Sequence, residues 1–260
     1  MEHGAVVQPE LEAVTHNLLH TYVELGRSTT GSRVWKERGF HACTGELDHP
    51  ICNFAVDLEL NEGIASRLRQ VAAQRRCFSL YTVPPIDQER HSEILHAEGF
   101  ALSHKLQIMI AETASAEATT LLEASEVPDR RRVADFMVDQ FFHKQPTPFK
   151  RGISEATARS TSLKLFKAEW NNRVAGAVMV SEHANIFGIY NLCVAPQFRS
   201  CGWGASIVRS IVEIARSKNC GVTLQCVPNL APWYGSLGFR EVGEVSVYGL
   251  FRFKEIDIIG

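Results

Sequence analysis

The chain has 260 residues, more than one average domain and fewer than three, and 45% of them are apolar, which is enough for a substantial core. The formal net charge of -2 argues against a nucleic acid or an anionic membrane held by bulk charge. The seven cysteines form no C-x-x-C pair and mostly lie among apolar neighbours. The sequence therefore predicts reduced, partly buried thiols and no zinc site.

The N-terminal stretch MEHGAVVQPELEAV has neither a basic segment nor a long apolar run, so we expect no signal peptide. No apolar segment approaches the ~20 residues that span a membrane. His16 and His20 have the spacing of metal ligands on a helix, but no third ligand completes the set. We expect a cytoplasmic protein with no metal and no membrane or nucleic-acid partner.

The first half of the chain alternates strands and helices. Its strands are predicted at 51–60, 77–83 and 99–110, from β-branched and apolar runs. Its helices are predicted at 63–75 and 86–98, from apolar residues at helical spacing. The small, polar segment 111–120 then suits a linker.

The second half opens with a helix at 127–142, a proline-containing loop at 143–152 and a short helix at 154–162. Strands follow at 163–170, 174–182 and 185–195. A long amphipathic helix begins at Trp203, and Gly221 can close it. A strand at 222–227, a short helix at 229–237 and a final pair of strands at 239–253 complete the prediction.

Both halves end in the order strand, helix, Gly-Phe, strand. Gly99-Phe100 and Gly238-Phe239 are the matching points, 139 residues apart. A two-copy repeat explains this more economically than one large sheet. We therefore predict an α+β protein with modules at 1–112 and 119–260, each a mixed, mostly antiparallel twisted sheet flanked by helices.

The segment between the strand at 185–195 and the next helix has the features of an anion site. Free backbone N–H groups at a helix start point outward, and the helix dipole adds partial positive charge. Gly202 and Gly204 remove side chains that would keep a phosphate away, and Arg199 adds a fixed charge. The Walker lysine and the third glycine of the dinucleotide fingerprint are both missing, so these two nucleotide motifs are excluded.

Arg199-x-x-Gly202-x-Gly204 after a strand ending VAP resembles the acetyl-CoA signature of the GNAT superfamily of N-acetyltransferases, and WYGSLGF resembles its second signature. The two motifs are separated by one strand, as in that family, and the resemblance covers roughly residues 119–253. The first half resembles a degenerate copy. It has LELNEGI where the glycine motif would stand, and Leu95 at the position that matches Tyr234.

The resemblance implies transfer of an acetyl group from acetyl-CoA to a primary amine, by direct attack in a ternary complex. The pyrophosphate would be held by the backbone of Arg199, Ser200, Cys201, Gly202, Trp203, Gly204 and Ala205. The pantetheine would pair with the strand edge at Leu192, Cys193 and Val194. A backbone N–H near Val194 would polarise the thioester carbonyl.

Tyr234 would protonate the departing thiolate, and the alternative is a tyrosine that only packs in the core. Asn229 matches a cofactor-contacting asparagine of the family in part, and a helix N-cap role explains it equally well. A nucleophilic cysteine is possible at Cys193 or Cys201 but is not needed for aminolysis of a thioester. The general base is unassigned, with Glu182, His183 and Tyr190 as candidates.

The acceptor follows least directly from the residues. In this fold the loop after the first helix borders the acceptor site, so Phe149, Lys150 and Arg151 would set specificity, and the two cations would suit an acidic acceptor. The acceptor would be a small-molecule or peptide amine, and a homodimer remains open. The alternatives are a non-catalytic sensor of CoA or acyl-CoA, a transferase with another acyl chain or acceptor, and a structural scaffold.

Overall fold

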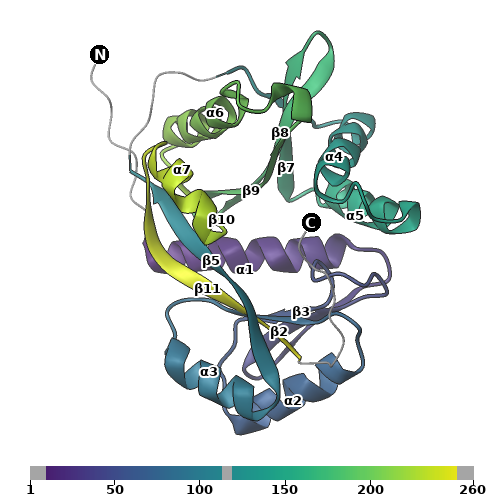
Figure 1. The fold of residues 1–260 in the computed structure, drawn as a ribbon, viewed down its shortest axis with the longest axis vertical. Helices are drawn as coiled ribbons and strands as arrows, with labels where there is room; N and C mark the ends of the chain where they lie inside the picture. The colour runs from purple at the N-terminus through teal and green to yellow at the C-terminus, as the bar shows by residue number, and fades with distance from the viewer. Residues whose placement is uncertain (1–9, 113–118, 251–260) are drawn as a thin grey trace.

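The computed structural model describes residues 10–112 and 119–250, and all eleven of the strands within them form one sheet. The order across the sheet is β1-β2-β3-β4-β11-β5-β10-β9-β8-β7-β6 (Figure 1). The sequence predicts a separate sheet for each half, whereas the strands make one continuous sheet. The reason is that two long strands, one from each half, lie side by side at its centre and belong to both halves.

The first half holds these elements in chain order: α1 (Leu11–Ser28), β1 (Arg33–Glu37), β2 (Phe40–Thr44), β3 (Phe54–Val56), α2 (Glu62–Ala73), β4 (Ser79–Thr82), α3 (Gln88–Ala97) and β5 (Phe100–Ala111). The predicted helices and strands of this half are all found, and β3 is shorter than expected. Most of the predicted linker, residues 113–118, lies outside the described residues.

The second half holds, again in chain order, β6 (Leu122–Glu123), α4 (Val127–Phe141), α5 (Thr147–Arg159), β7 (Leu163–Trp170), β8 (Arg173–His183), β9 (Ile186–Val194), α6 (Trp203–Ser217), β10 (Gly221–Cys226), α7 (Ala231–Gly235) and β11 (Phe239–Leu250). Short 3-10 turns at Pro196–Phe198 and Pro228–Leu230 precede α6 and α7.

Two predictions for this half are wrong. The expected loop 143–152 is largely helical, because Pro148 falls in the first turn of α5, where the missing N–H has no helical partner to lose. The expected final pair of strands is one strand, β11, which has a bulge at Val242 and does not turn back. Residues 251–253 of that prediction lie outside the described residues.

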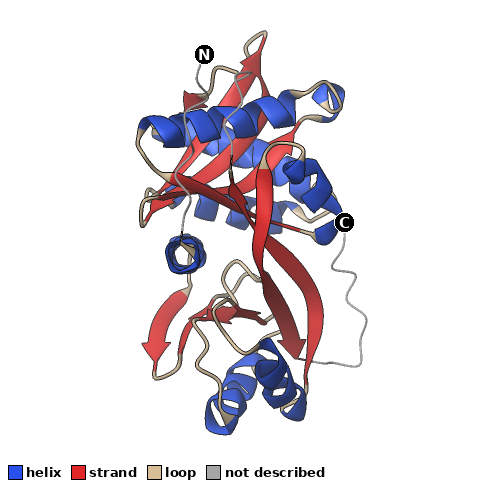
Figure 2. Ribbon diagram, turned by 90° about the vertical axis from the view of Figure 1, so that its left-hand side faces the viewer, coloured by secondary structure: helices blue, strands red, loops and turns tan. Residues whose placement is uncertain are grey.

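The central strands β5 and β11 are antiparallel, with Phe100 opposite Leu250 and Ala111 opposite Phe239. Each strand has one bulge, at Ser103 and at Val242, where the register shifts. These bulges are 139 residues apart, the same offset that relates Phe100 to Phe239. The register of the pair is therefore symmetric under exchange of the two halves, and Figure 2 shows the two strands running between the helices at either end.

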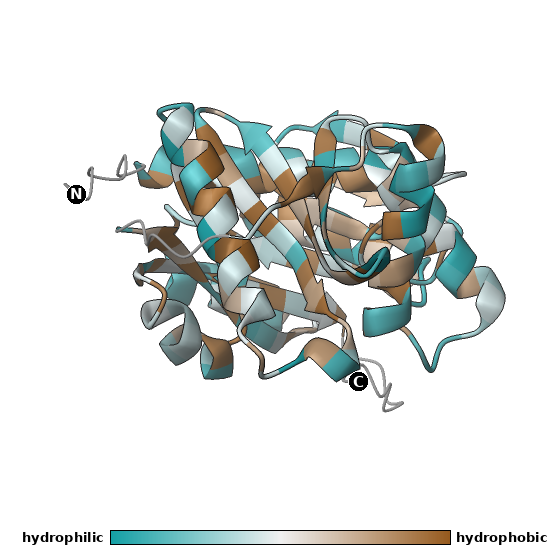
Figure 3. Ribbon diagram, turned by 90° about the horizontal axis from the view of Figure 1, so that it is seen from above, coloured by the Kyte–Doolittle hydropathy of each residue, from teal (hydrophilic) through white to brown (hydrophobic). Residues whose placement is uncertain are grey.

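Helices cover both faces of the second half's strands. Ile207, Val208 and Ile211 of α6 pack with strand residues on one face. Val133 and Met137 of α4 pack on the other face. Figure 3 shows hydrophobic residues (brown) and hydrophilic residues (teal) mixed along the helices, and the residues of α6 and α4 named above are all buried, as expected for amphipathic helices.

Helix α1 belongs to the first half in sequence but is anchored to the second. The fully buried side-chain amide of Asn17 donates to the carbonyls of Ser181 at 2.9 Å and Ile186 at 3.0 Å. Its carbonyl oxygen accepts from the Tyr190 hydroxyl at 3.1 Å. A side chain at Gly188 would lie 2.2 Å from that oxygen, so only glycine fits there. The anchor holds α1 across the β8–β9 hairpin.

Candidate functional site

The strands β9 and β10 run parallel and then separate. Among the described residues, the first pair is Ile186 opposite Gly221 and the last pair is Ile189 opposite Leu224. Beyond that point β9 continues beside β8 only, and β10 continues beside β5. The sheet therefore opens into a wedge, which we call the β9–β10 wedge, starting at Tyr190 on one side and Gln225 on the other.

The wall of the wedge on β9 presents backbone groups. The Ala195 N–H donates to Ala175 on the β8 side at 2.9 Å. Since backbone groups alternate sides along a strand, the N–H and C=O of Val194 point away from β8 and into the wedge. The Arg199 guanidinium donates to that Val194 carbonyl at 3.0 Å, which ties the following loop to the end of the strand.

The strand β9 is distorted just before this wall. Asn191 has a φ of 50°, in the left-handed region, and the β8–β9 register shifts by one residue there. Such a bulge re-aims the backbone next to it. Leu192 lies at the bulge, half-buried, and Cys193 is buried beside Ala177. Sequence reasoning missed the bulge, although an asparagine ahead of a strand end is a residue that tolerates this geometry.

The start of α6 leaves its backbone donors open. Gly202 is the N-cap with a φ of 82°, and no side chain of the described residues caps the helix there. The first helical hydrogen bond runs from Ser206 N–H to Gly202 O at 3.0 Å. The N–H groups of Trp203, Gly204 and Ala205 therefore precede the helical ladder. Ser200 also has a positive φ, of 60°, and Ser200, Cys201 and Gly202 are exposed.

The two glycines of the motif differ in what surrounds them. A Cβ on Gly202 would have no atom within 4 Å, so this position faces open space. A Cβ on Gly204 would lie 3.5 Å from the Trp233 ring, which is an ordinary packing distance. Only Gly202 therefore meets the expectation of a glycine that keeps the approach to the helix start clear.

Tyr234 lies in α7 and is 7% exposed. Its ring packs against Trp233, with centroids 4.7 Å apart, and against Phe239 at 5.9 Å. Burial, with a smaller contribution from the nearby Cys226 thiol, raises the pKa of the Tyr234 phenol to about 12. The phenol therefore keeps its proton throughout the physiological range.

Asn229 does not cap the short helix. It lies exposed in the 3-10 turn Pro228–Leu230, and Leu230 is the residue before α7. The N-cap interpretation is therefore wrong, and a cofactor contact by Asn229 stays a prediction. Burial raises the pKa of the Cys193 thiol to about 12, which keeps it protonated and unsuited to nucleophilic attack.

The candidate general bases all have other partners. Glu182 accepts hydrogen bonds from Lys164 and Lys218, and its pKa is lowered because these lysines outweigh partial burial. His183 stacks on His20 with centroids 4.1 Å apart. Burial raises the pKa of Tyr190, whose hydroxyl donates to Asn17. None of the three is set up to take a proton from an amine in the wedge.

A cavity of about 310 Å³ lies next to the wedge, between the two halves of the chain. The first half contributes mainly rings to it: Tyr22, His49, Phe54 and Tyr81. The second half contributes Asn191 of β9 and residues of α4, its C-cap Phe142 and α5: Met137, Val138, Phe141, Phe142, Ile153 and Thr157. No local sequence signal marks the first-half residues, because only the folded chain brings them beside α4.

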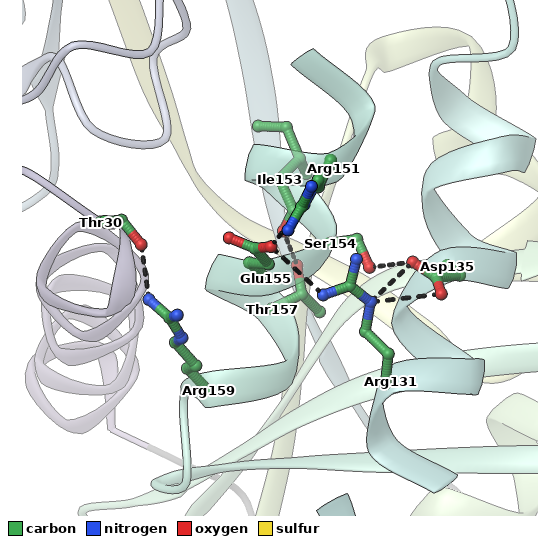
Figure 4. Close-up of polar contacts among 9 residues, drawn as sticks. All are labelled: Thr30, Arg131, Asp135, Arg151, Ile153, Ser154, Glu155, Thr157 and Arg159. Atoms are coloured by element: carbon green, nitrogen blue, oxygen red, sulfur yellow. Dashed lines mark hydrogen bonds and ion pairs between the residues drawn. The ribbon is translucent and has the colours of Figure 1, made fainter. Parts of the chain in front are cut away.

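The loop expected to favour an acidic acceptor does not provide free cations. Lys150 donates to Asp139 at 2.9 Å, and Arg151 donates to Glu155 at 2.9 Å, a carboxylate that Arg131 also approaches (Figure 4). Neither Lys150 nor Arg151 lines the cavity as far as the chain is described. Phe149 lies behind the wall, packed on His49 and Phe142 at 5.5 Å. The basis for an acidic acceptor is therefore removed.

Comparison with known proteins identifies this architecture. Residues 132–253 match the family model of the acetyltransferase (GNAT) domain. No curated protein matches the chain. Among solved structures, a GCN5-related N-acetyltransferase from Kribbella flavida aligns with a TM-score of 0.64 and 11% identity, covering 94% of this chain and 96% of that one.

Two further solved structures align over most of the chain. A functionally unknown conserved protein from Staphylococcus epidermidis gives a TM-score of 0.60 at 13% identity, covering 85% of this chain and 94% of that one. A tandem GNAT protein from the clavulanic acid biosynthesis pathway gives 0.56 at 11% identity, covering 95% and 98%. The fold is thus that of the GNAT acetyltransferases, and the matched domain contains the β9–β10 wedge, α6 and α7.

In the parts of the chain that the structure describes, no helix is both long and apolar enough to cross a bilayer. Nor does any group of three or more His, Cys, Asp and Glu side chains there have a metal-holding arrangement.

Proposed function

We propose that the protein is an N-acetyltransferase that moves an acetyl group from acetyl-CoA to a primary amine, with both substrates bound together. The observation that carries this is the start of α6, where a left-handed glycine and uncapped N–H groups adjoin the open end of β9. These donors suit a diphosphate, since a helix N-terminus binds anions through its free N–H groups and its dipole. Arg199 adds a charge beside them.

The rest of acetyl-CoA would follow the wedge. The pantetheine would lie along Leu192, Cys193 and Val194 as an added strand lies along a sheet edge. The N–H of Val194 points into the wedge and would donate to the thioester oxygen as it gains negative charge. Asn229, exposed in the turn after β10, would contact the cofactor from the opposite side of the wedge.

The reaction forms a nitrogen–carbon bond and breaks the sulfur–carbon bond, while one proton leaves nitrogen and one reaches sulfur. Since the Tyr234 pKa of about 12 lies above the usual thiol value of about 8.5, the phenol is a weaker acid than CoA. Tyr234 would therefore donate a hydrogen bond to the departing sulfur, giving up its proton only as it recovers the one released by the amine. No covalent enzyme intermediate is needed.

The modules at 1–112 and 119–260 remain part of this proposal. The symmetric register of β5 and β11, with matching bulges, supports a duplicated ancestor whose two copies share their central strands. The likeness to a solved tandem GNAT protein is a second support. In this interpretation the first half has lost its cofactor site and now supplies walls and strands to the second.

A non-catalytic sensor of CoA is the main competitor, and the burial of Tyr234 in the core favours it. One assay separates the two. The full chain is incubated with acetyl-CoA and a set of primary amines, and acetyl-CoA binding, free thiol and acetylated product are all measured. Amine-dependent thiol release with matching product supports the transferase. Binding of acetyl-CoA without release supports the sensor, and no binding contradicts both.

A further inference from the structure

The cavity between the two halves carries no formal charge at neutral pH. Within the described residues, no Asp, Glu, Lys or Arg side chain lines it. Its one imidazole, His49, has a pKa lowered by burial to about 4, and its Nδ1 accepts from the Ile51 N–H at 3.1 Å. Burial raises the pKa of both lining phenols, Tyr22 and Tyr81, so they stay protonated.

The cavity reaches the point where β9 and β10 separate. On the β9 side it is lined by Asn191, which follows the first unpaired residue of that strand. On the β10 side its Tyr22 hydroxyl donates to the Gln225 side-chain oxygen at 2.8 Å, and Gln225 is the first residue of β10 past the last pair. A group held in the cavity thus enters the wedge at its inner end, beside the stretch of β9 from Leu192 to Val194 along which the proposed pantetheine and thioester would lie.

From this geometry we infer that the cavity is the acceptor site and that it takes an uncharged aromatic amine, a one- or two-ring body with the amino group on the ring. The inference rests on the proposed acetyl transfer and names its substrate class. It also makes the first half of the chain a part of the active site, because Tyr22, His49, Phe54 and Tyr81 form one side of the acceptor wall.

Size and surface both fit such an acceptor. A cavity of about 150 Å³ lined by apolar side chains holds benzene, so about 310 Å³ accommodates one or two rings. The aromatic walls offer edge-to-face contacts of the kind that already join His49 and Phe142, whose centroids are 5.2 Å apart at 89°. A polyamine, an amino sugar or an acidic peptide would find no charged partner here.

The described lining of the cavity holds no Asp, Glu or Lys that could serve as a base, and this favours the same acceptor. An aliphatic amine with a pKa of about 10.4 is neutral in only about one molecule in 2,500 at pH 7. An amino group attached to an aromatic ring is weakly basic because its lone pair is delocalised, so it enters already neutral. No residue is then needed to deprotonate it before attack.

The test is a panel of matched acceptors with the full chain: aniline and 5-aminoindole against benzylamine, cyclohexylamine, spermidine and glucosamine. Acetyl-CoA binding is measured first by calorimetry, and kcat/KM is then measured for each amine from pH 6 to 9. Phe141→Ala removes part of the cavity wall. Leu102→Ala is the matched control, since both side chains are 41% exposed and Leu102 lies outside the cavity, on β5.

We expect kcat/KM to be at least about tenfold higher for aniline and 5-aminoindole than for the other four amines. For these two compounds we expect kcat/KM to stay constant from pH 6 to 9. We also expect Phe141→Ala to raise the acceptor KM severalfold without changing the acetyl-CoA KM, and Leu102→Ala to change neither. A preference for spermidine or glucosamine, or an unchanged acceptor KM in Phe141→Ala, would overturn the inference while the acetyltransferase proposal stands. Absence of acetyl-CoA binding would overturn the acetyltransferase proposal itself.

Discussion

The two halves of the chain each start a helix after an inner strand of the sheet, yet the two helix starts have opposite chemistry. In the first half, the Asn61 side chain caps α2 by accepting from the Ile64 N–H at 3.0 Å, and Glu62 follows in the first turn. In the second half, Gly202 precedes α6 with no side-chain cap among the described residues, and the first turn carries no acid.

The surroundings of the two helices differ in the same sense. A hollow of about 220 Å³ beside α2 and α3 is lined by Glu62, Glu93 and Glu98, which would repel a phosphate. The start of α6 has Arg199 beside it instead, and Trp233 of α7 packs on its Gly204. Of these two helix starts, only that of α6 combines unused backbone donors with neighbours that are not acidic, which is the combination that the proposed anion site requires.

The largest expected effect concerns Tyr234, whose matching position in the first half, 139 residues earlier, is Leu95. Tyr234→Phe keeps the packed ring but removes the proposed proton donor, so kcat should fall about 100-fold with little change in the KM for acetyl-CoA. Since burial holds the Tyr234 pKa near 12, the wild-type kcat should show no loss from this phenol between pH 7 and 10. An unchanged kcat in the variant would leave Tyr234 as a packing residue.

The next effect compares two glycines with the same backbone. Gly202 and Gly99 both have a φ of 82° and no atom within 4 Å of an added Cβ, so alanine costs each roughly 1–2 kcal/mol of folding free energy. Gly202→Ala should also weaken acetyl-CoA binding at least about tenfold, because its Cβ would stand where the phosphate approaches. Titration calorimetry and chemical denaturation of both variants measure this, and equal affinities would contradict the proposed cradle.

A smaller effect is expected for the charge beside α6. Arg199→Gln should weaken acetyl-CoA binding about three- to tenfold, because a charge-assisted contact to phosphate is lost, and the loss should shrink in high salt. The matched variant is Arg67→Gln on α2, whose guanidinium pairs with Glu37 on the surface. Binding curves at two salt concentrations for both variants provide the measurement, and an Arg199 loss independent of salt would count against phosphate contact.

The smallest effect concerns the self-capped helix of the first half. Asn61→Ala removes the cap of α2 and should lower the free energy of unfolding by about 1 kcal/mol. It should not create a second site for CoA, because the acidic hollow remains. Denaturant unfolding measures the first part, and the stoichiometry of CoA binding measures the second. Binding of more than one CoA per chain would show that the Asn61 cap alone prevents CoA from binding at the start of α2.

Much of this comparison could be predicted from the sequence. The strand–glycine loop–helix pattern around Arg199 and Gly202 is local, and α6 begins at Trp203 as predicted. The predicted close of this helix at Gly221 is wrong, because α6 ends at Ser217 and Gly221 is the first residue of β10. The apolar periodicity of α2, α3 and α6 likewise located these helices. The sequence predicts the same role for Gly204 as for Gly202, and only the folded chain shows that the Trp233 ring lies beside Gly204.

What escaped prediction depends on contacts between distant segments. Pattern alone could not show that β5 and β11 pair across the two halves, since each strand has the same alternation whichever partner it meets. The cavity wall joins Tyr22 and Phe54 to residues more than 80 positions later in the chain. The sequence predicts Lys150 and Arg151 as free cations for an acidic acceptor, but it does not show the carboxylate partners, Asp139 and Glu155, that they contact in the folded chain.

The central claim is that the exposed amides at the start of α6 bind the diphosphate of CoA, and removing the diphosphate from the ligand tests it most directly. Calorimetry would compare acetyl-CoA with S-acetylpantetheine, which keeps the thioester and both amides but lacks the diphosphate and the adenosine beyond it. Loss of two or more charge-assisted hydrogen bonds should weaken the truncated ligand roughly 100-fold. No heat with acetyl-CoA, or equal affinity for the two ligands, would contradict the claim.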